Sequence, residues 1–175
     1  MKKILCCAAA AVTMLFSGCA ADITGGKPEL DKTFSAEASI AIGGETVAGT
    51  LNRMSDNCWS LEVTAPHTLE GLTVTYDNGE TTLSMLGFEC TADFSDSAVS
   101  ALKLLAEAYE TAADNTGGFE NGMLEYTNEN GTFSVTLDEN GMPAQINAGG
   151  VYVKLSDWTE NTAQQSESDE LILLE

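Results

Sequence analysis

Residues 64–87 read TAPHTLEGLTVTYDNGETTLSMLG. Apolar and polar residues alternate through residues 72–76, the chain turns at Asn78 and Gly79, and the alternation then resumes. A period of two is the pattern of a β-strand with one buried face, and Asn-Gly is favoured in two-residue hairpin turns. The stretch therefore predicts a β-hairpin, which needs another element to cover its apolar face.

The same alternation recurs along most of the chain, separated by Gly-Gly, Asn-Gly and Ser-Asp-Asn turns. It predicts nine antiparallel strands, at residues 34–42, 47–51, 58–64, 72–76, 80–90, 122–127, 132–137, 143–148 and 151–155.

Between the fifth and sixth expected strands the apolar spacing changes to that of a helix, over residues 95–113. Its apolar stripe consists of Val99, Leu102, Leu105, Ala106, Tyr109 and Ala113. Asp93, Ser95 and Asp96 are suitable N-terminal caps, and Gly117-Gly118 ends the helix.

One helix is too small to cover this sheet. Nine strands at about 4.8 Å spacing span roughly 43 Å, whereas a nineteen-residue helix is about 28 Å long and 10 to 12 Å across. We therefore expect a mainly β (α+β) fold, in which a strongly curved antiparallel sheet forms an unclosed β-barrel around the helix.

The concave face of this half-barrel is either filled by side chains or open to an apolar ligand. A core and a cavity wall have the same periodicity, so the sequence leaves both alternatives open. The candidate cavity-lining residues are Phe34, Ile40, Trp59, Leu61, Val63, Leu72, Val74, Leu105, Tyr109, Phe133, Val135 and Val153.

The N-terminus has the pattern of an export signal. Lys2 and Lys3 precede a mostly apolar run at residues 4–16, and Ser17-Gly18 then leads to Cys19. This cleavage region resembles the lipobox of bacterial lipoproteins, in which the cysteine carries a thioether-linked diacylglycerol. We expect a signal peptide at residues 1–18, with Cys19 as the lipid anchor.

The rest of the chain divides into a tether, one domain and a tail. Residues 19–32 contain Gly25-Gly26 and Pro28 and are expected to form a flexible tether, whereas residues 33–158 form the half-barrel. Residues 159–175 are acidic and expected to be disordered. The expected location is the outer face of the cytoplasmic membrane, or the outer membrane of a cell with two membranes.

Charge and composition exclude several classes of function. The net charge is −20, which excludes nucleic acid as a partner and favours a protein partner with a basic surface. The single histidine, His67, lies in an expected loop without a nucleophile in a recognisable turn beside it. We expect no metal, no cofactor and no catalysis.

Cys58 and Cys90 are the two cysteines that follow Cys19. An exported pair suggests a disulfide, but a simple meander places these residues at opposite ends of the sheet. The bonded pair and the free thiols both remain open.

The expected order of five strands, a helix and four strands resembles that of the LolA/LolB-like lipoprotein-carrier superfamily. Two stretches carry this resemblance, LEVTAPHTLEGLTVTYDNGETTLSMLG and TFSVTLDENGMPAQINAGGVYVKLSDW. The resemblance covers about residues 34–158 and implies an unclosed β-barrel that holds lipid or lipoprotein acyl chains without catalysis. The family's arginine and aromatic phrase is represented here only by Arg53 and Trp59. The chain is thus expected to be an anchored lipoprotein that binds an apolar ligand; the alternative is an interaction or envelope-sensor module with a packed interior and an acidic binding face.

Overall fold

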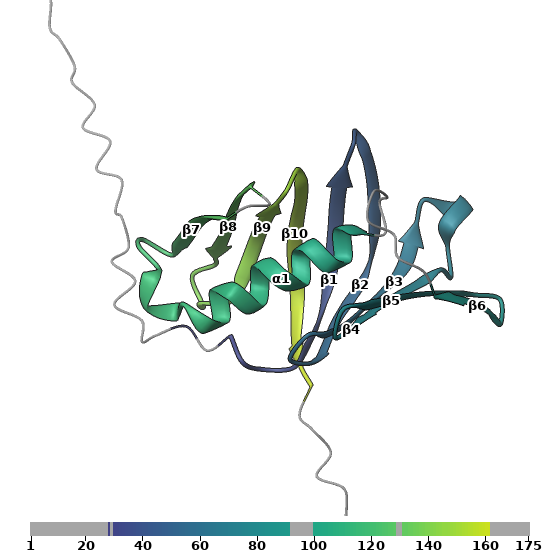
Figure 1. Cartoon of the computed structure of the whole chain (residues 1–175), viewed down its shortest axis with the longest axis horizontal. Helices are drawn as coiled ribbons and strands as arrows, with labels where there is room; N and C mark the ends of the chain where they lie inside the picture. Colours follow the sequence, from purple (N-terminus) through teal and green to yellow (C-terminus); the bar gives the residue numbers. More distant parts are fainter. Residues whose placement is uncertain (1–27, 29, 92–99, 129–130, 162–175) are drawn as a thin grey trace, which may run out of the picture.

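The computed structural model describes residues 28, 30–91, 100–128 and 131–161. In this part of the chain, ten antiparallel strands form one sheet in the order β6-β5-β4-β3-β2-β1-β10-β9-β8-β7 (Figure 1). The strands are β1 (Phe34–Ile42), β2 (Glu45–Ser55), β3 (Cys58–Ala65), β4 (Thr73–Asp77), β5 (Glu80–Met85), β6 (Phe88–Thr91), β7 (Met123–Asn128), β8 (Gly131–Leu137), β9 (Pro143–Ala148) and β10 (Val151–Glu160).

The expected fold class is confirmed: the protein is mainly β, and its antiparallel sheet is not closed. The two halves of the chain join where β1 pairs with β10, which leaves β6 and β7 as the sheet edges. Helix α1 (Ser100–Asp114) lies across one face of the sheet, and its C-terminal end is on the β7 side (Figure 1). The expected helix start at Ser95 lies outside the described residues.

The expected fifth strand at residues 80–90 is wrong as a single strand. The chain reverses at Leu86 and Gly87, so that β5 and β6 form a further hairpin with Met85 opposite Phe88. Both turn residues have positive φ, 52° at Leu86 and 82° at Gly87. Leucine rarely adopts a positive φ, which explains why the sequence pattern did not predict a turn at Leu86.

The core lies between α1 and the sheet. Four buried residues of the helix are alanines, and their small side chains let α1 approach the strands closely: Ala101, Ala106, Ala108 and Ala112. The larger side chains that fill the space include Phe34, Trp59, Tyr109, Phe133 and Ile146, all almost completely buried. This close packing supplies most of the hydrophobic stabilisation of the domain.

Gly49 in β2 allows close contact with β3. A methyl group at this position would lie 2.1 Å from the carbonyl oxygen of Glu62, and the strand register shifts between Ala48 and Gly49. Glycine is needed here because a side chain would push the strands apart.

The short 3₁₀ turn His67–Leu69 lies between β3 and β4. A second 3₁₀ turn, Thr116–Gly118, follows α1. Among the described helices, none is long and apolar enough to cross a membrane.

Candidate functional site

The structure brings the twelve candidate cavity-lining residues together in one apolar cluster. Eleven of them are buried, and Leu72 is half-buried against the same cluster. They contact one another and α1 in the manner of a packed core. None of them lines the surface hollow over β4, β5 and β6 or the hollow beside β7. A role for these residues in holding a ligand stays a prediction.

Four aromatic rings form the densest part of this core. The ring of Phe34 lies 5.6 Å from both Trp59 and Tyr109, and 4.2 Å from Trp158, between ring centroids. Trp59 and Tyr109 meet edge to face at 4.9 Å. Pairs of this geometry contribute about 0.5 to 1.5 kcal/mol beyond the area that they bury.

A buried ion pair connects β2 to α1 beside these rings. The side chain of Arg53 is 1% exposed and donates from Nε to Glu110 Oε1 at 3.0 Å and from Nη2 to Oε2 at 2.8 Å. The indole Nε1 of Trp59 and the backbone N–H of Asn57 also donate to Glu110 Oε1, at 3.0 and 3.2 Å. Glu110 thus accepts hydrogen bonds from Arg53 and Trp59 of the sheet and from Asn57 in the turn between β2 and β3.

The remaining donor capacity of Arg53 is also satisfied. Its Nη1 donates to the backbone carbonyls of Asp31 and Lys32, at 2.9 and 3.0 Å, and its Nη2 also contacts Asp56 Oδ1 at 2.6 Å. Its guanidinium carbon lies 5.5 Å from the centroid of the Tyr109 ring. The network therefore joins the segment before β1, the β2–β3 turn and the helix.

The burial and hydrogen bonds of this network shift the pKa values of Arg53 and Tyr109. Burial alone lowers the pKa of Arg53, but the hydrogen bonds and charge of Glu110 outweigh it, and the net pKa is raised. Burial raises the pKa of Tyr109, although the positive charge of Arg53 opposes this effect. At neutral pH Arg53 is therefore a cation and Tyr109 a neutral phenol.

Sequence reasoning noted Arg53 without a role and missed Glu110. Two signals were present: Arg53 falls on the inward positions of its strand after Leu51, and Glu110 follows Tyr109 at the border of the apolar helix stripe. A charge at an inward strand position needs a buried partner. The identity of that partner depends on how the helix crosses the sheet.

The apolar face of the sheet continues beyond this core. Val74 and Tyr76 of β4 are buried, and the pairing of β4 with β5 and of β5 with β6 puts Leu83, Met85 and Phe88 on the same face. Leu83 and Met85 are half-buried, whereas Phe88 is 81% exposed. We call Leu83, Met85 and Phe88 the β5–β6 strip.

The helix lies over other strands. The strands that α1 approaches over most of its length are β3, β4, β8, β9 and β10, and β5 and β6 are not among them. Leu86, in the turn that follows Met85, is 88% exposed. The β5–β6 strip is therefore a portion of the apolar face that α1 leaves accessible to solvent.

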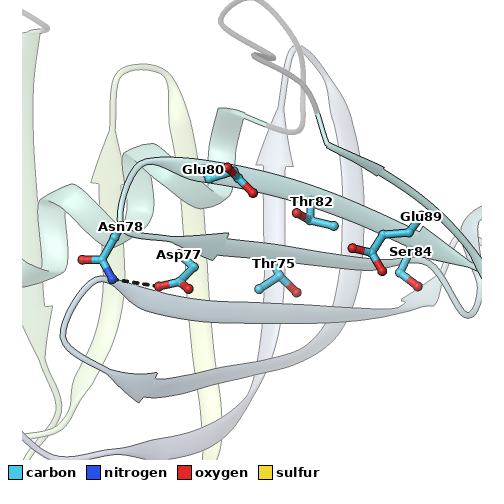
Figure 2. A pocket seen from close by; sticks show the side chains of 7 residues that line it. All are labelled: Thr75, Asp77, Asn78, Glu80, Thr82, Ser84 and Glu89. Atoms are coloured by element: carbon cyan, nitrogen blue, oxygen red, sulfur yellow. Dashed lines mark hydrogen bonds between the residues drawn. The ribbon is translucent and has the colours of Figure 1, made fainter.

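The opposite face of the same hairpin is polar and hollowed. A groove of about 490 Å³ runs over β4, β5 and β6 and is lined by Thr75, Asp77, Asn78, Glu80, Thr82, Ser84 and Glu89 (Figure 2). Asn78 donates from Nδ2 to Asp77 Oδ1 at 2.8 Å. None of the described lysines or arginines forms an ion pair with the three carboxylates, so the groove is negative.

The remaining predicted residues are placed as follows. Cys58 and Cys90 are free thiols, and the expected alternative of a disulfide is not formed, because β4 and β5 lie between their strands. Burial raises the pKa of Cys58, and Asp77 opposite it adds to the effect. His67 is exposed and contacts Glu70, and Cys19 lies outside the described residues.

The described residues contain no group of three or more His, Cys, Asp or Glu side chains that could hold a metal ion.

Comparison with known proteins finds likeness at the level of three-dimensional structure. No family model and no curated protein matches the chain. A LolA superfamily protein from Nitrosomonas europaea has 10% identity and a TM-score of 0.45, over 75% of this chain and 87% of that one. An uncharacterized conserved protein from Thermus thermophilus has 10% identity and a TM-score of 0.44, over 76% and 81% of the two chains.

A DUF1329 family protein from Desulfovibrio piger has 8% identity and a TM-score of 0.39, over 76% of this chain and 87% of that one. At these values the similarity carries no inference about ligands or activity. The strand pairing of the chain itself establishes the unclosed sheet.

Proposed function

We propose that this protein is an exported lipoprotein, anchored through Cys19, that binds an acyl chain or a similar apolar ligand without catalysing a reaction. One observation carries the binding proposal: the apolar face of the sheet extends past α1 onto the β5–β6 strip, where Phe88 is 81% exposed. The ligand would cover this strip and continue the apolar layer that α1 begins.

The energetics fit a moderately tight ligand. Each methylene that leaves water contributes about 0.8 kcal/mol, so ten methylenes on the strip would contribute roughly 8 kcal/mol before the losses of association. A micromolar dissociation constant corresponds to about 8 kcal/mol. Burial of Phe88 and the exposed parts of Leu83 and Met85 would add to this gain and offset part of those losses.

Binding is tested by titrating the delipidated chain with a fluorescent fatty acid. Phe88→Ser is expected to weaken binding at least about fivefold, because it removes the largest exposed apolar side chain of the strip. Glu89→Ser is the matched control, since Glu89 is the next residue on β6 and points to the opposite face. No uptake at micromolar ligand, or equal loss in the two variants, would overturn the proposal.

The anchoring proposal rests on residues 1–19 and is tested separately. Cells that express the chain and are fed labelled palmitate are expected to label it, and Cys19→Ala is expected to abolish both the label and membrane association. An unlabelled chain that is exported without an anchor would refute it. The domain itself is strongly acidic and should stand away from anionic headgroups.

The groove in Figure 2 supports a second candidate function, an interaction or envelope-sensor module with a basic protein partner. Asp77, Glu80 and Glu89 supply the negative charge, and the threonine and serine hydroxyls can hydrogen-bond an extended chain. A salt-sensitive complex that weakens in Glu89→Gln but not in Phe88→Ser would favour this function. The reverse pattern would favour the apolar ligand.

A further inference from the structure

A second hollow, of about 500 Å³, lies at the other end of the sheet. It opens where the last turn of α1 and the following 3₁₀ turn meet β7, and its lining residues are Thr111, Asp114, Asn115, Gly117, Gly118, Leu124 and Tyr126. Because β7 and β6 are the opposite edges of the sheet, this hollow is separate from the β5–β6 strip.

The wall on the β7 side is apolar and held in place. Leu124 is buried, and the Tyr126 ring stacks on Phe133 with 5.2 Å between centroids and 7° between planes. The Tyr126 hydroxyl donates to the carbonyl of Ala108 at 3.4 Å. A methyl group at Gly118 would lie 2.8 Å from Leu124 Cδ1, so the 3₁₀ turn is in direct contact with this wall.

The helix side of the hollow is negative. The C-terminal end of a helix carries partial negative charge and is stabilised by cations, but the last turn of α1 contains no basic residue and ends with Asp114. Asn115 donates from its backbone N–H and its Nδ2 to the carbonyl of Thr111, at 3.1 and 2.7 Å. Asp114 has no ion pair within the described part of the chain.

We propose that this hollow binds a small organic cation with an apolar body, such as a substituted ammonium group. The cation would lie beside the Asp114 carboxylate and the helix end, and its carbon atoms would contact Leu124 and the ring of Tyr126. A carboxylate, a helix C-terminus and an aromatic ring all favour positive charge. A bare metal ion would need more oxygen ligands than one carboxylate, and an anion would be repelled.

The test uses choline and the neutral alcohol dimethylbutanol, in which carbon replaces the charged nitrogen, with the full chain. Binding is followed by NMR shifts of the amide groups of Asn115 and Gly117. Choline is expected to bind in roughly the millimolar range, as is typical of exposed cation sites, and at least about fivefold more tightly than the alcohol. Asp114→Asn is expected to weaken choline binding by a similar factor.

The control separates this site from the general attraction of a chain with net charge −20. Glu62→Gln removes the same charge from an exposed residue of β3, in the other half of the sheet, and is expected to change choline binding less than twofold. Equal weakening in both variants, equal binding of the alcohol, or no shifts up to tens of millimolar choline would overturn the proposal. Asp114 is exposed, so its replacement should leave the fold intact.

Discussion

Replacing Glu110 by leucine is expected to lower the free energy of unfolding by about 3 to 5 kcal/mol, the usual effect of removing one member of a buried ion pair. The change leaves the guanidinium of Arg53, 1% exposed, without its bidentate carboxylate partner. It also removes the acceptor for Trp59 Nε1 and for the backbone N–H of Asn57. Because Arg53 keeps its contacts with Asp56 and two backbone carbonyls, we expect a value near the lower limit.

The measurement is urea unfolding at neutral pH, followed by tryptophan fluorescence, because Trp59 contacts Glu110 directly. Glu107→Leu is the matched control on the same helix. Glu107 lies 3.9 Å from Lys103 in an exposed ion pair, and such pairs contribute about 0 to 1 kcal/mol.

A double variant tests the cause of the effect. Arg53→Met combined with Glu110→Leu replaces both charges by apolar side chains, and such replacements of buried pairs are often neutral or stabilising. The double variant should therefore be more stable than Glu110→Leu alone. A loss below about 1 kcal/mol in Glu110→Leu, or a double variant as unstable as the sum of the single variants, would refute this reasoning.

Three further predictions follow from the packing and the backbone. Burial raises the pKa of Tyr109, so the folded state disfavours its phenolate. The contribution of Tyr109 to the free energy of unfolding is complete below about pH 10 and falls as the pH rises above this value. Urea unfolding across this range should show a shallower fall in Tyr109→Phe. Gly49→Ala should lower the free energy of unfolding by about 2 kcal/mol or more, because its methyl group would meet the Glu62 carbonyl. Gly117→Ala, with open space around it, should change the free energy of unfolding by less than about 1 kcal/mol, and urea unfolding of the two variants checks both values. Leu86→Asn should raise the free energy of unfolding by roughly 0.5 to 1 kcal/mol, since φ is 52° at this exposed position; an unchanged or lower urea midpoint would contradict the assigned turn.

Local chemistry was enough to predict most of the elements. The alternation in β1, β3 and β4, the Asn78-Gly79 turn and the apolar stripe of α1 all depend on neighbouring residues, so they can be read along the chain. The excess of apolar sheet face over one helix also predicted the unclosed, curved sheet. The β5–β6 turn was missed because Leu86 lacks the chemistry of a turn residue: the other described non-glycine residues with positive φ are asparagines or an aspartate.

The site required the tertiary structure. Arg53 and Glu110 are 57 residues apart, and their pairing depends on the angle at which α1 crosses the sheet. The hollow at the C-terminal end of α1 likewise arises only because the helix ends beside β7. Alternation determines which residues face inward. The position of α1 determines that the twelve predicted residues pack as a core while the β5–β6 strip remains accessible to solvent. The physical reason is that burial depends on which other residues pack against a side chain, and not on the side chain alone.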